Sequence, residues 1–204
     1  ASLLSTSHSF LGNVVEAEKW LNYARSRKEQ LDEWNTHHKG LNWRGGSVSN
    51  AKGRFSIMKG EFADAEKFYI EAVEHLRKIP GDWSLGPYLR ELADAQILMG
   101  KYREAELTIR EALAILIKEM GANSPLTALG LVVLSKILNE QGRSKDAESL
   151  ARTAMSIYEK GNTLKSSMAY GKAQETLVTT LIVQNKYQEA YTLSQNQYKA
   201  ISAI

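Results

Sequence analysis

Small apolar residues recur along the chain at a spacing that predicts paired helices. The segment GKYREAELTIREALAIL, residues 100–116, places Ala105 and Ala112 two helical turns apart. Both alanines therefore share one helix face, where a small side chain lets a neighbouring helix approach closely. Gly100 suits the left-handed conformation that ends a preceding helix. The pattern predicts a turn at Gly100 followed by an amphipathic helix.

The same pattern occurs five times. Its turn residues are Gly12, Gly60, Gly100, Gly142 and Asn185, at intervals of 48, 40, 42 and 43 residues. The first alanines of the copies are Ala17, Ala65, Ala105, Ala147 and Ala190. The second alanines are Ala24, Ala72, Ala112 and Ala154, whereas the last copy has Gln197. Because a period of 20–50 residues is typical of solenoids, the sequence predicts stacked helical repeats.

The segment before each turn has the pattern of a first helix. In residues 124–142, Ser124 is the expected N-cap and Pro125 the first helical residue. Leu131, Leu134 and Leu138 then recur at helical spacing. No strand-like alternation of useful length interrupts the series. The predicted fold class is all-α.

These motifs resemble the tetratricopeptide repeat, which has a Gly-x-aromatic turn and two alanines in its second helix. Ordinary members repeat every 34 residues, and the longer period here is similar to the kinesin-light-chain type, also common in bacterial regulatory proteins. HEAT repeats share the length but not the glycine turn. The resemblance implies a right-handed α-solenoid of antiparallel helix hairpins, a tetratricopeptide-like superhelix. A single solenoid over residues 1–204 is expected, with helical units at about 1–45, 46–85, 86–125, 126–163 and 164–204.

The resemblance also implies where a partner binds, since first helices line the concave side in this family. One first helix has a stripe expected to be buried: Leu89, Leu92, Ala93 and Gln96. The face about 130° away, with its counterparts in other units, gives the candidate partner-binding residues. They are Asn50, Arg54, Ile57, Arg90, Asp94, Ile97, Val132, Lys136, Asn139, Lys172, Glu175 and Ile182. The apolar anchors are expected to be Ile57, Ile97, Val132 and Ile182. The cations expected to favour an acidic or carboxylate-bearing partner are Arg54, Arg90, Lys136 and Lys172.

Two segments depart from the pattern. The first helix before Gly60 has Ser49, Lys52 and Ser56 where apolar residues are expected, so Phe55 and Met58 are alternatives for the inward face. The segment LNWRGGS, residues 41–47, contains two adjacent glycines and lies in the longest interval. We expect it to form a long loop between helices, with a loop that contacts a partner as the alternative.

Catalytic and metal-binding motifs are missing. The four histidines, His8, His37, His38 and His75, form no HExxH arrangement, and the chain contains neither a GxSxG elbow nor a phosphate-binding loop. Cysteine is absent, so thiolate chemistry is excluded. We therefore expect no enzymatic activity, no metal and no cofactor.

Composition and charge narrow the classes of partner that the chain is expected to bind. The formal net charge is +3, and acidic residues interleave with the basic ones, as in EKWLNYARSRKEQL. Nucleic-acid binding is not expected, because it favours basic residues concentrated on one face. No apolar stretch approaches the roughly 18 residues of a membrane span, so membrane insertion is not expected. A cytoplasmic location is preferred, and the absence of cysteine leaves the compartment open.

The predicted function is a non-enzymatic protein–protein interaction scaffold that binds a peptide or protein in its concave groove. The alternative is a sensing or regulatory segment of a larger protein, because long-period repeats resemble those attached to CHAT-type proteases and signal-transduction ATPases. Self-association through the ends of the solenoid is a third alternative. The apolar end AISAI and the short first unit favour a fragment of a longer protein.

Overall fold

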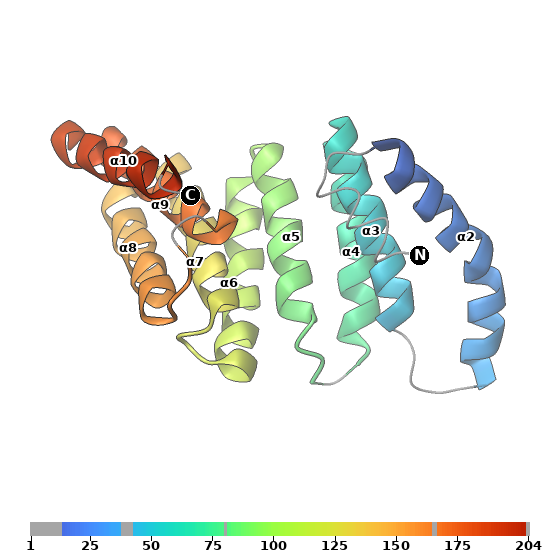
Figure 1. The fold of residues 1–204 in the computed structure, drawn as a ribbon. Helices are drawn as coiled ribbons and strands as arrows, with labels where there is room; N and C mark the ends of the chain where they lie inside the picture. Colours follow the sequence, from blue (N-terminus) through green and yellow to red (C-terminus); the bar gives the residue numbers. More distant parts are fainter. Residues whose placement is uncertain (1–13, 38–42, 80, 165–166, 203–204) are drawn as a thin grey trace. The chain divides into compact units, whose positions relative to one another are not determined.

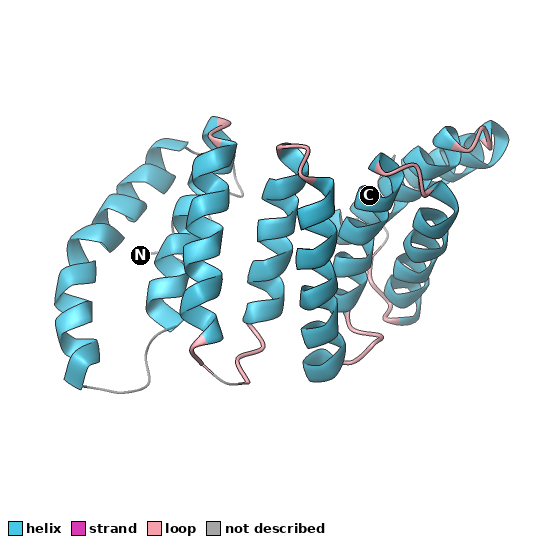
Figure 2. Ribbon diagram, turned by 180° about the vertical axis from the view of Figure 1, so that it is seen from behind, coloured by secondary structure: helices cyan, strands magenta, loops and turns pink. Residues whose placement is uncertain are grey.

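The computed structural model describes residues 14–37, 43–79, 81–164 and 167–202. Within these ranges the chain forms nine α-helices and no strand (Figures 1 and 2). The all-α prediction is confirmed, while the right-handed superhelical sense stays a prediction. The chain divides into two compact units, residues 1–100 and 101–204.

Unit 1 contains four helices in sequential contact. They are α2 (Val14–His37), α3 (Trp43–Lys59), α4 (Phe62–Arg77) and α5 (Leu85–Leu98). Ala17 and Leu21 of α2 form a buried cluster with Ala51 and Phe55 of α3. The apolar stripe of α2 is thereby covered by α3.

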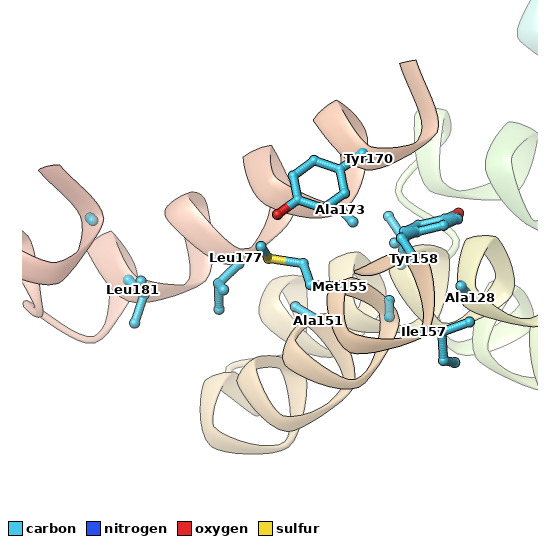
Figure 3. Close-up of a cluster of buried hydrophobic side chains, with 12 residues drawn as sticks. Ala128, Ala151, Met155, Ile157, Tyr158, Tyr170, Ala173, Leu177 and Leu181 are labelled. Carbon is cyan, nitrogen blue, oxygen red and sulfur yellow. The ribbon is translucent and has the colours of Figure 1, made fainter. Parts of the chain in front are cut away.

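Unit 2 contains the remaining five helices. They are α6 (Tyr102–Met120), α7 (Pro125–Glu140), α8 (Ser144–Lys160), α9 (Met168–Val183) and α10 (Tyr187–Ser202). Figure 3 shows part of their core, in which Met155 and Tyr158 of α8 pack with Tyr170, Leu177 and Leu181 of α9. Because α7 contacts both α8 and α9, it is buried on two sides.

The predicted turn residues have the expected backbone conformation. Gly60, Gly100 and Gly142 have φ of 76°, 71° and 76°, and Asn185 has φ of 61°. The turn at Gly142 is closed by two backbone bonds, from Gly142 N to Asn139 O and from Arg143 N to Leu138 O. This arrangement satisfies carbonyls at the end of the preceding helix. Gly12 lies outside the described residues.

The paired alanines are buried as predicted. The first alanines of the five copies are at most 3% exposed and the second alanines at most 5%. The cap before α7 is also confirmed, since Ser124 Oγ accepts from Thr127 N at 3.1 Å and Pro125 begins the helix. The small residues thus admit neighbouring helices as the repeat pattern predicts.

The loop expected over residues 41–47 is wrong from Trp43 onward, because α3 begins there. Gly46 is buried against α4, where a Cβ atom would lie 3.2 Å from Ala72 O. Further along α3, a Cβ atom on Gly53 would lie 2.7 Å from the Tyr69 ring. The glycines therefore allow close packing of α3 on α4.

The inward face of α3 differs from a simple apolar stripe. Val48, Ala51 and Phe55 are buried, and so are the polar residues Ser49 and Ser56. The alternative prediction, in which Phe55 faces inward, is confirmed. Small hydroxyl side chains occupy positions where a larger residue would separate the packed helices.

Candidate partner-binding faces

The candidate residues of unit 1 surround a carboxylate on α5. Glu91 is only 8% exposed and accepts from Asn50 Nδ2 of α3, with a distance of 2.8 Å to Glu91 Oε2. Arg54 Nε donates to the same oxygen at 3.0 Å, and Arg54 Nη2 donates to Oε1. Two residues of α3 are therefore held by one side chain of the next first helix.

Arg90 joins the same network from its own helix. Its Nη2 donates to Glu91 Oε1 at 3.1 Å and its Nη1 to Asp94 Oδ2 at 2.8 Å. The side chains of Arg54 and Arg90 are 18% and 15% exposed. Both guanidinium groups thus have carboxylate partners within unit 1, which weakens the interpretation that they select an acidic partner.

Glu91 is the residue of this network that the sequence analysis missed. It lies beside the buried stripe of α5, at a position that resembles an ordinary solvated charge. Its partners on α3 are 37 and 41 residues away. The sequence contains one signal of this pairing. Asn50 and Arg54 are one helical turn apart and lie one repeat before Glu91. The buried Tyr69 is close by, and burial together with Glu91 raises the pKa of its hydroxyl.

The candidate residues of unit 2 lie on α7 and α9, which are in contact. On α9, Lys172, Glu175, Thr179 and Ile182 are all exposed, and their spacing places them on one helix face. Met168 begins the same row, so its two ends are apolar, with exposures of 68% for Met168 and 48% for Ile182. This row is the most accessible part of the predicted surface.

The α7 side of this surface is less accessible. Lys136 and Asn139 are half-buried. Asn139 Nδ2 donates to Thr180 Oγ1 of α9 at 2.5 Å, whereas its Oδ1 is buried and has no hydrogen-bond partner in the described part of the chain. Asn139 thus links adjacent first helices through its amide, as Asn50 does in unit 1.

Two candidate positions are buried and are therefore not part of the exposed faces, although exposure was expected for both. Val132 is 1% exposed and belongs to the core cluster of unit 2. Asn50 is 6% exposed, with its amide bound to Glu91. The reason is that contact with both a second helix and the next first helix widens the buried arc beyond the single stripe assumed from sequence.

The cations of the two units differ in their surroundings. Arg54 and Arg90 are paired with Glu91 and Asp94. Over the described ranges, neither Lys136 nor Lys172 of unit 2 forms an ion pair. Among these four cations, only the two lysines have no ion pair within the described ranges.

A second set of carboxylates lies at the turns of unit 2, away from these faces. Glu148 of α8 accepts from Lys186 Nζ at 2.6 Å, from Gln184 Nε2 at 2.8 Å and from Arg152 Nη2 at 2.8 Å. Lys186 contributes most to holding the pKa of Glu148 at about 2, with Arg152 and Gln184 adding to the effect. This carboxylate fixes the turn of one hairpin to the second helix of the preceding hairpin.

Glu106 of α6 has the equivalent position one repeat earlier. It accepts from Arg110 Nη2 at 2.7 Å and from Arg143 Nη1 of the following turn at 3.1 Å. The hydrogen bond from Arg110 is the main cause of a lowered pKa for Glu106, followed by one from Gln141. We call this arrangement the turn bracket: a carboxylate bound by the residues directly before and after the next turn residue.

Neither a cluster of metal-ligating side chains nor a membrane-spanning helix is found among the described residues. No group of three or more His, Asp or Glu side chains among them is placed to hold a metal ion. No helix in the same ranges is long and apolar enough to cross a membrane. His37 is at the end of α2 and His75 lies in α4, while His8 and His38 fall outside the described residues.

Comparison with known proteins agrees with this geometry. Residues 47–118 match the family model of the tetratricopeptide repeat. A comparison with curated protein sequences found no match.

Several solved structures are similar along nearly the whole chain. A Podosopora anserina protein with nearly identical, kinesin-light-chain TPR-like repeats shows 21% identity over 99% of this chain and 93% of its own, with a TM-score of 0.68. BtubC (BKLC) from P. vanneervenii shows 17% identity, coverage of 99% and 78%, and a TM-score of 0.78. The apo form of RapI shows 14% identity, coverage of 98% and 68%, and a TM-score of 0.75.

At these identities the likeness to solved structures concerns the fold. The family model covers the central hairpins; the same turns and alanines continue after it at Gly142 and Asn185, and the buried Ala17 and Ala24 precede it. Folds of this kind present extended surfaces for other proteins. Residues 47–118 thus match the tetratricopeptide repeat, and the chain as a whole has the fold of the kinesin-light-chain-like repeat structures.

Proposed function

We propose that the protein is a non-enzymatic scaffold that binds a peptide or protein segment on the exposed faces of its first helices. These faces belong to α3 and α5 in unit 1 and to α7 and α9 in unit 2. The proposal is supported by the fold, because repeat packing occupies one side of each first helix and leaves the other side for recognition.

The observation that carries the proposal is the exposed row on α9. Met168 and Ile182 place apolar surface at its two ends, and Lys172 and Glu175 lie between them. Buried anchors supply most of the binding energy in such interfaces, while charges set register and partner choice. A segment with an apolar residue at each end and a polar centre fits this row.

The charge of the partner follows from the state of the cations. Lys136 and Lys172 have no ion pair within the described ranges, whereas Arg54 and Arg90 are bound to carboxylates of unit 1. A carboxylate of the partner would gain from contact with either lysine, but would compete with Glu91 for the arginines. Selection for an acidic segment is therefore assigned to unit 2.

A peptide-display selection followed by affinity measurement tests the proposal. Peptides selected on the wild-type chain are expected to bind the double variant Lys172→Glu/Ile182→Asp at least about tenfold more weakly, since one charge pair and one apolar anchor are lost. Lys145→Glu is the matched control, because Lys145 is an exposed lysine on α8. Equal affinity for wild type and the double variant would reject the proposed face.

A further inference from the structure

A cavity of about 260 Å³ lies between α2, α3 and α4, within unit 1. Its apolar lining comes from Leu21 of α2, Phe55 of α3 and Phe68 of α4. Leu21 and Phe55 are buried members of the core. The cavity does not include any of the candidate partner-binding residues, so it is a separate feature from the first-helix faces.

The cavity lies at the position of a turn bracket, but a residue of this turn has the opposite charge to its counterparts in unit 2. Glu18 of α2 comes six residues after its turn position, as do Glu106 and Glu148 in unit 2. In unit 2 the residue before the next turn residue is glutamine, and the residue after it is the cation Arg143 or Lys186. At the corresponding α3–α4 turn these positions hold Lys59 and Glu61. A carboxylate thus replaces the cation that the bracket requires.

Lys59 is already paired with Glu61, the carboxylate that stands in place of the cation. Lys59 Nζ lies 2.5 Å from Glu61 Oε1. Glu18 and Asp64 also line the cavity, and neither makes a hydrogen bond or ion pair within the described part of the chain. Glu61 is the main cause of a raised pKa for Lys59, and Glu18 and Asp64 add to it. Two carboxylates therefore face the cavity without a full partner.

The remaining lining is suited to a positive charge with an apolar stem. Lys59 Nζ lies 5.6 Å from the centroid of the Phe55 ring, and Lys52 Nζ lies 5.3 Å from that of Phe68. Aromatic faces attract ammonium and guanidinium groups at such distances. Ser56, which also lines the cavity, is 3% exposed, and its hydroxyl has no hydrogen-bond partner among the described residues. A buried polar group of this kind is available to a ligand.

We propose that this cavity binds an organic cation, either a guanidinium or an alkylammonium group. Glu18 and Asp64 bind the charge, and the apolar stem of the ligand lies against Phe55 and Phe68. Lys59 is a built-in competitor, because its ammonium group already occupies part of the same acidic and aromatic surroundings. The described carboxylates are not grouped as a metal site, which favours an organic cation.

Titration of the full chain with agmatine and with cadaverine tests the proposal. Calorimetry should give saturable binding of at least one of these amines. The double variant Glu18→Gln/Asp64→Asn should bind about tenfold more weakly, because two charge-assisted contacts are lost. Lys59→Met should bind several-fold more tightly, because it removes the competing ammonium. Glu148→Gln is the matched control, since it changes the equivalent carboxylate of a complete bracket, and should leave binding unchanged.

The Glu18→Gln/Asp64→Asn variant is expected to bind more weakly and Lys59→Met more tightly. These opposite effects distinguish binding in the cavity from a general effect of net charge. Absence of saturable binding, an unchanged affinity in the Glu18→Gln/Asp64→Asn variant, or an equal loss in Glu148→Gln would overturn the proposal. A short peptide with one central arginine distinguishes the sources of the cation. Tighter binding of this peptide than of agmatine assigns the site to a side chain of a partner, and the reverse assigns it to a free amine.

Discussion

The side-chain amide of Asn50 on α3 donates to the carboxylate of Glu91 on α5 at 2.8 Å. Arg54 of α3 approaches the same carboxylate with two nitrogen atoms. Glu91 therefore connects two first helices that are one repeat apart in the sequence. Because the carboxylate is nearly buried, removing it leaves two guanidinium groups in a poorly solvated position.

Replacement of Glu91 should accordingly destabilise unit 1. We expect Glu91→Ala to lower the free energy of unfolding by about 3 kcal/mol, the cost of removing the carboxylate from a mostly buried ion pair. Urea unfolding followed by circular dichroism measures this change. Asp94→Asn is the control, because Asp94 is 43% exposed and should contribute less than about 1 kcal/mol. Similar losses in both variants would show that Glu91 has no special structural role.

The turn before α10 permits a test of backbone conformation. Asn185 has φ of 61°, a region where asparagine is tolerated and alanine is strained. Asn185→Ala should cost about 1 kcal/mol, whereas Asn185→Gly should stay within about 0.5 kcal/mol of wild type or stabilise the protein. Thermal unfolding of the two variants gives the comparison. If alanine were tolerated as well as glycine, the left-handed conformation would not be required at this turn.

The turn bracket of Glu148 should make stability depend on pH. Its pKa is about 2 in the folded protein, below the ordinary value of 4.5, chiefly because of Lys186. The stabilisation is therefore fully present above about pH 5 and is lost as the pH falls toward 2. It should be on the order of 2 kcal/mol, since the two cationic partners are partly solvated.

Denaturant unfolding of wild type and Glu148→Gln over pH 2–7 measures this effect. The two proteins should differ most near neutral pH and become similar near pH 2. Glu189→Gln is a suitable control, because Glu189 has the same cationic neighbour, Arg152, but is 48% exposed. A difference between wild type and Glu148→Gln that stays constant over this range would contradict the assignment.

Close packing of α3 on α4 depends on Gly53. A Cβ atom there would lie 2.7 Å from the Tyr69 ring, so Gly53→Ala should cost about 1–3 kcal/mol through overpacking. Equilibrium unfolding measures the cost. The additional change Tyr69→Leu should recover part of it, because the smaller side chain gives the methyl group room. A neutral Gly53→Ala substitution would mean that the helices separate without loss of stability.

The sequence predicts the helical repeats well because their determinants are local. A left-handed turn residue and two alanines on one face are sufficient to define each hairpin, and Gly142, Ala147 and Ala154 show all three features. The segment near Gly46 is predicted wrongly as a loop because glycine serves both loops and close helix contacts. Only the presence of α4 decides between these roles.

The candidate site is predicted less completely, because it depends on pairs of residues in different repeats. The exposed row containing Lys172 and Ile182 follows from helical spacing and agrees with the structure. The burial of Val132 and the pairing of Arg54 with Glu91 depend on which neighbouring helix covers each face. One helix considered alone does not contain that information.

Site-specific photocrosslinking tests the central claim most directly. A photoreactive amino acid is placed at Thr179 on the exposed row of α9, or at Thr153, an exposed threonine of α8. With a peptide selected on the wild-type chain, we expect crosslinking from position 179 that an excess of unlabelled peptide abolishes, and little from position 153. Equal crosslinking from both positions, or crosslinking from position 153 alone, would contradict partner binding on the first helices.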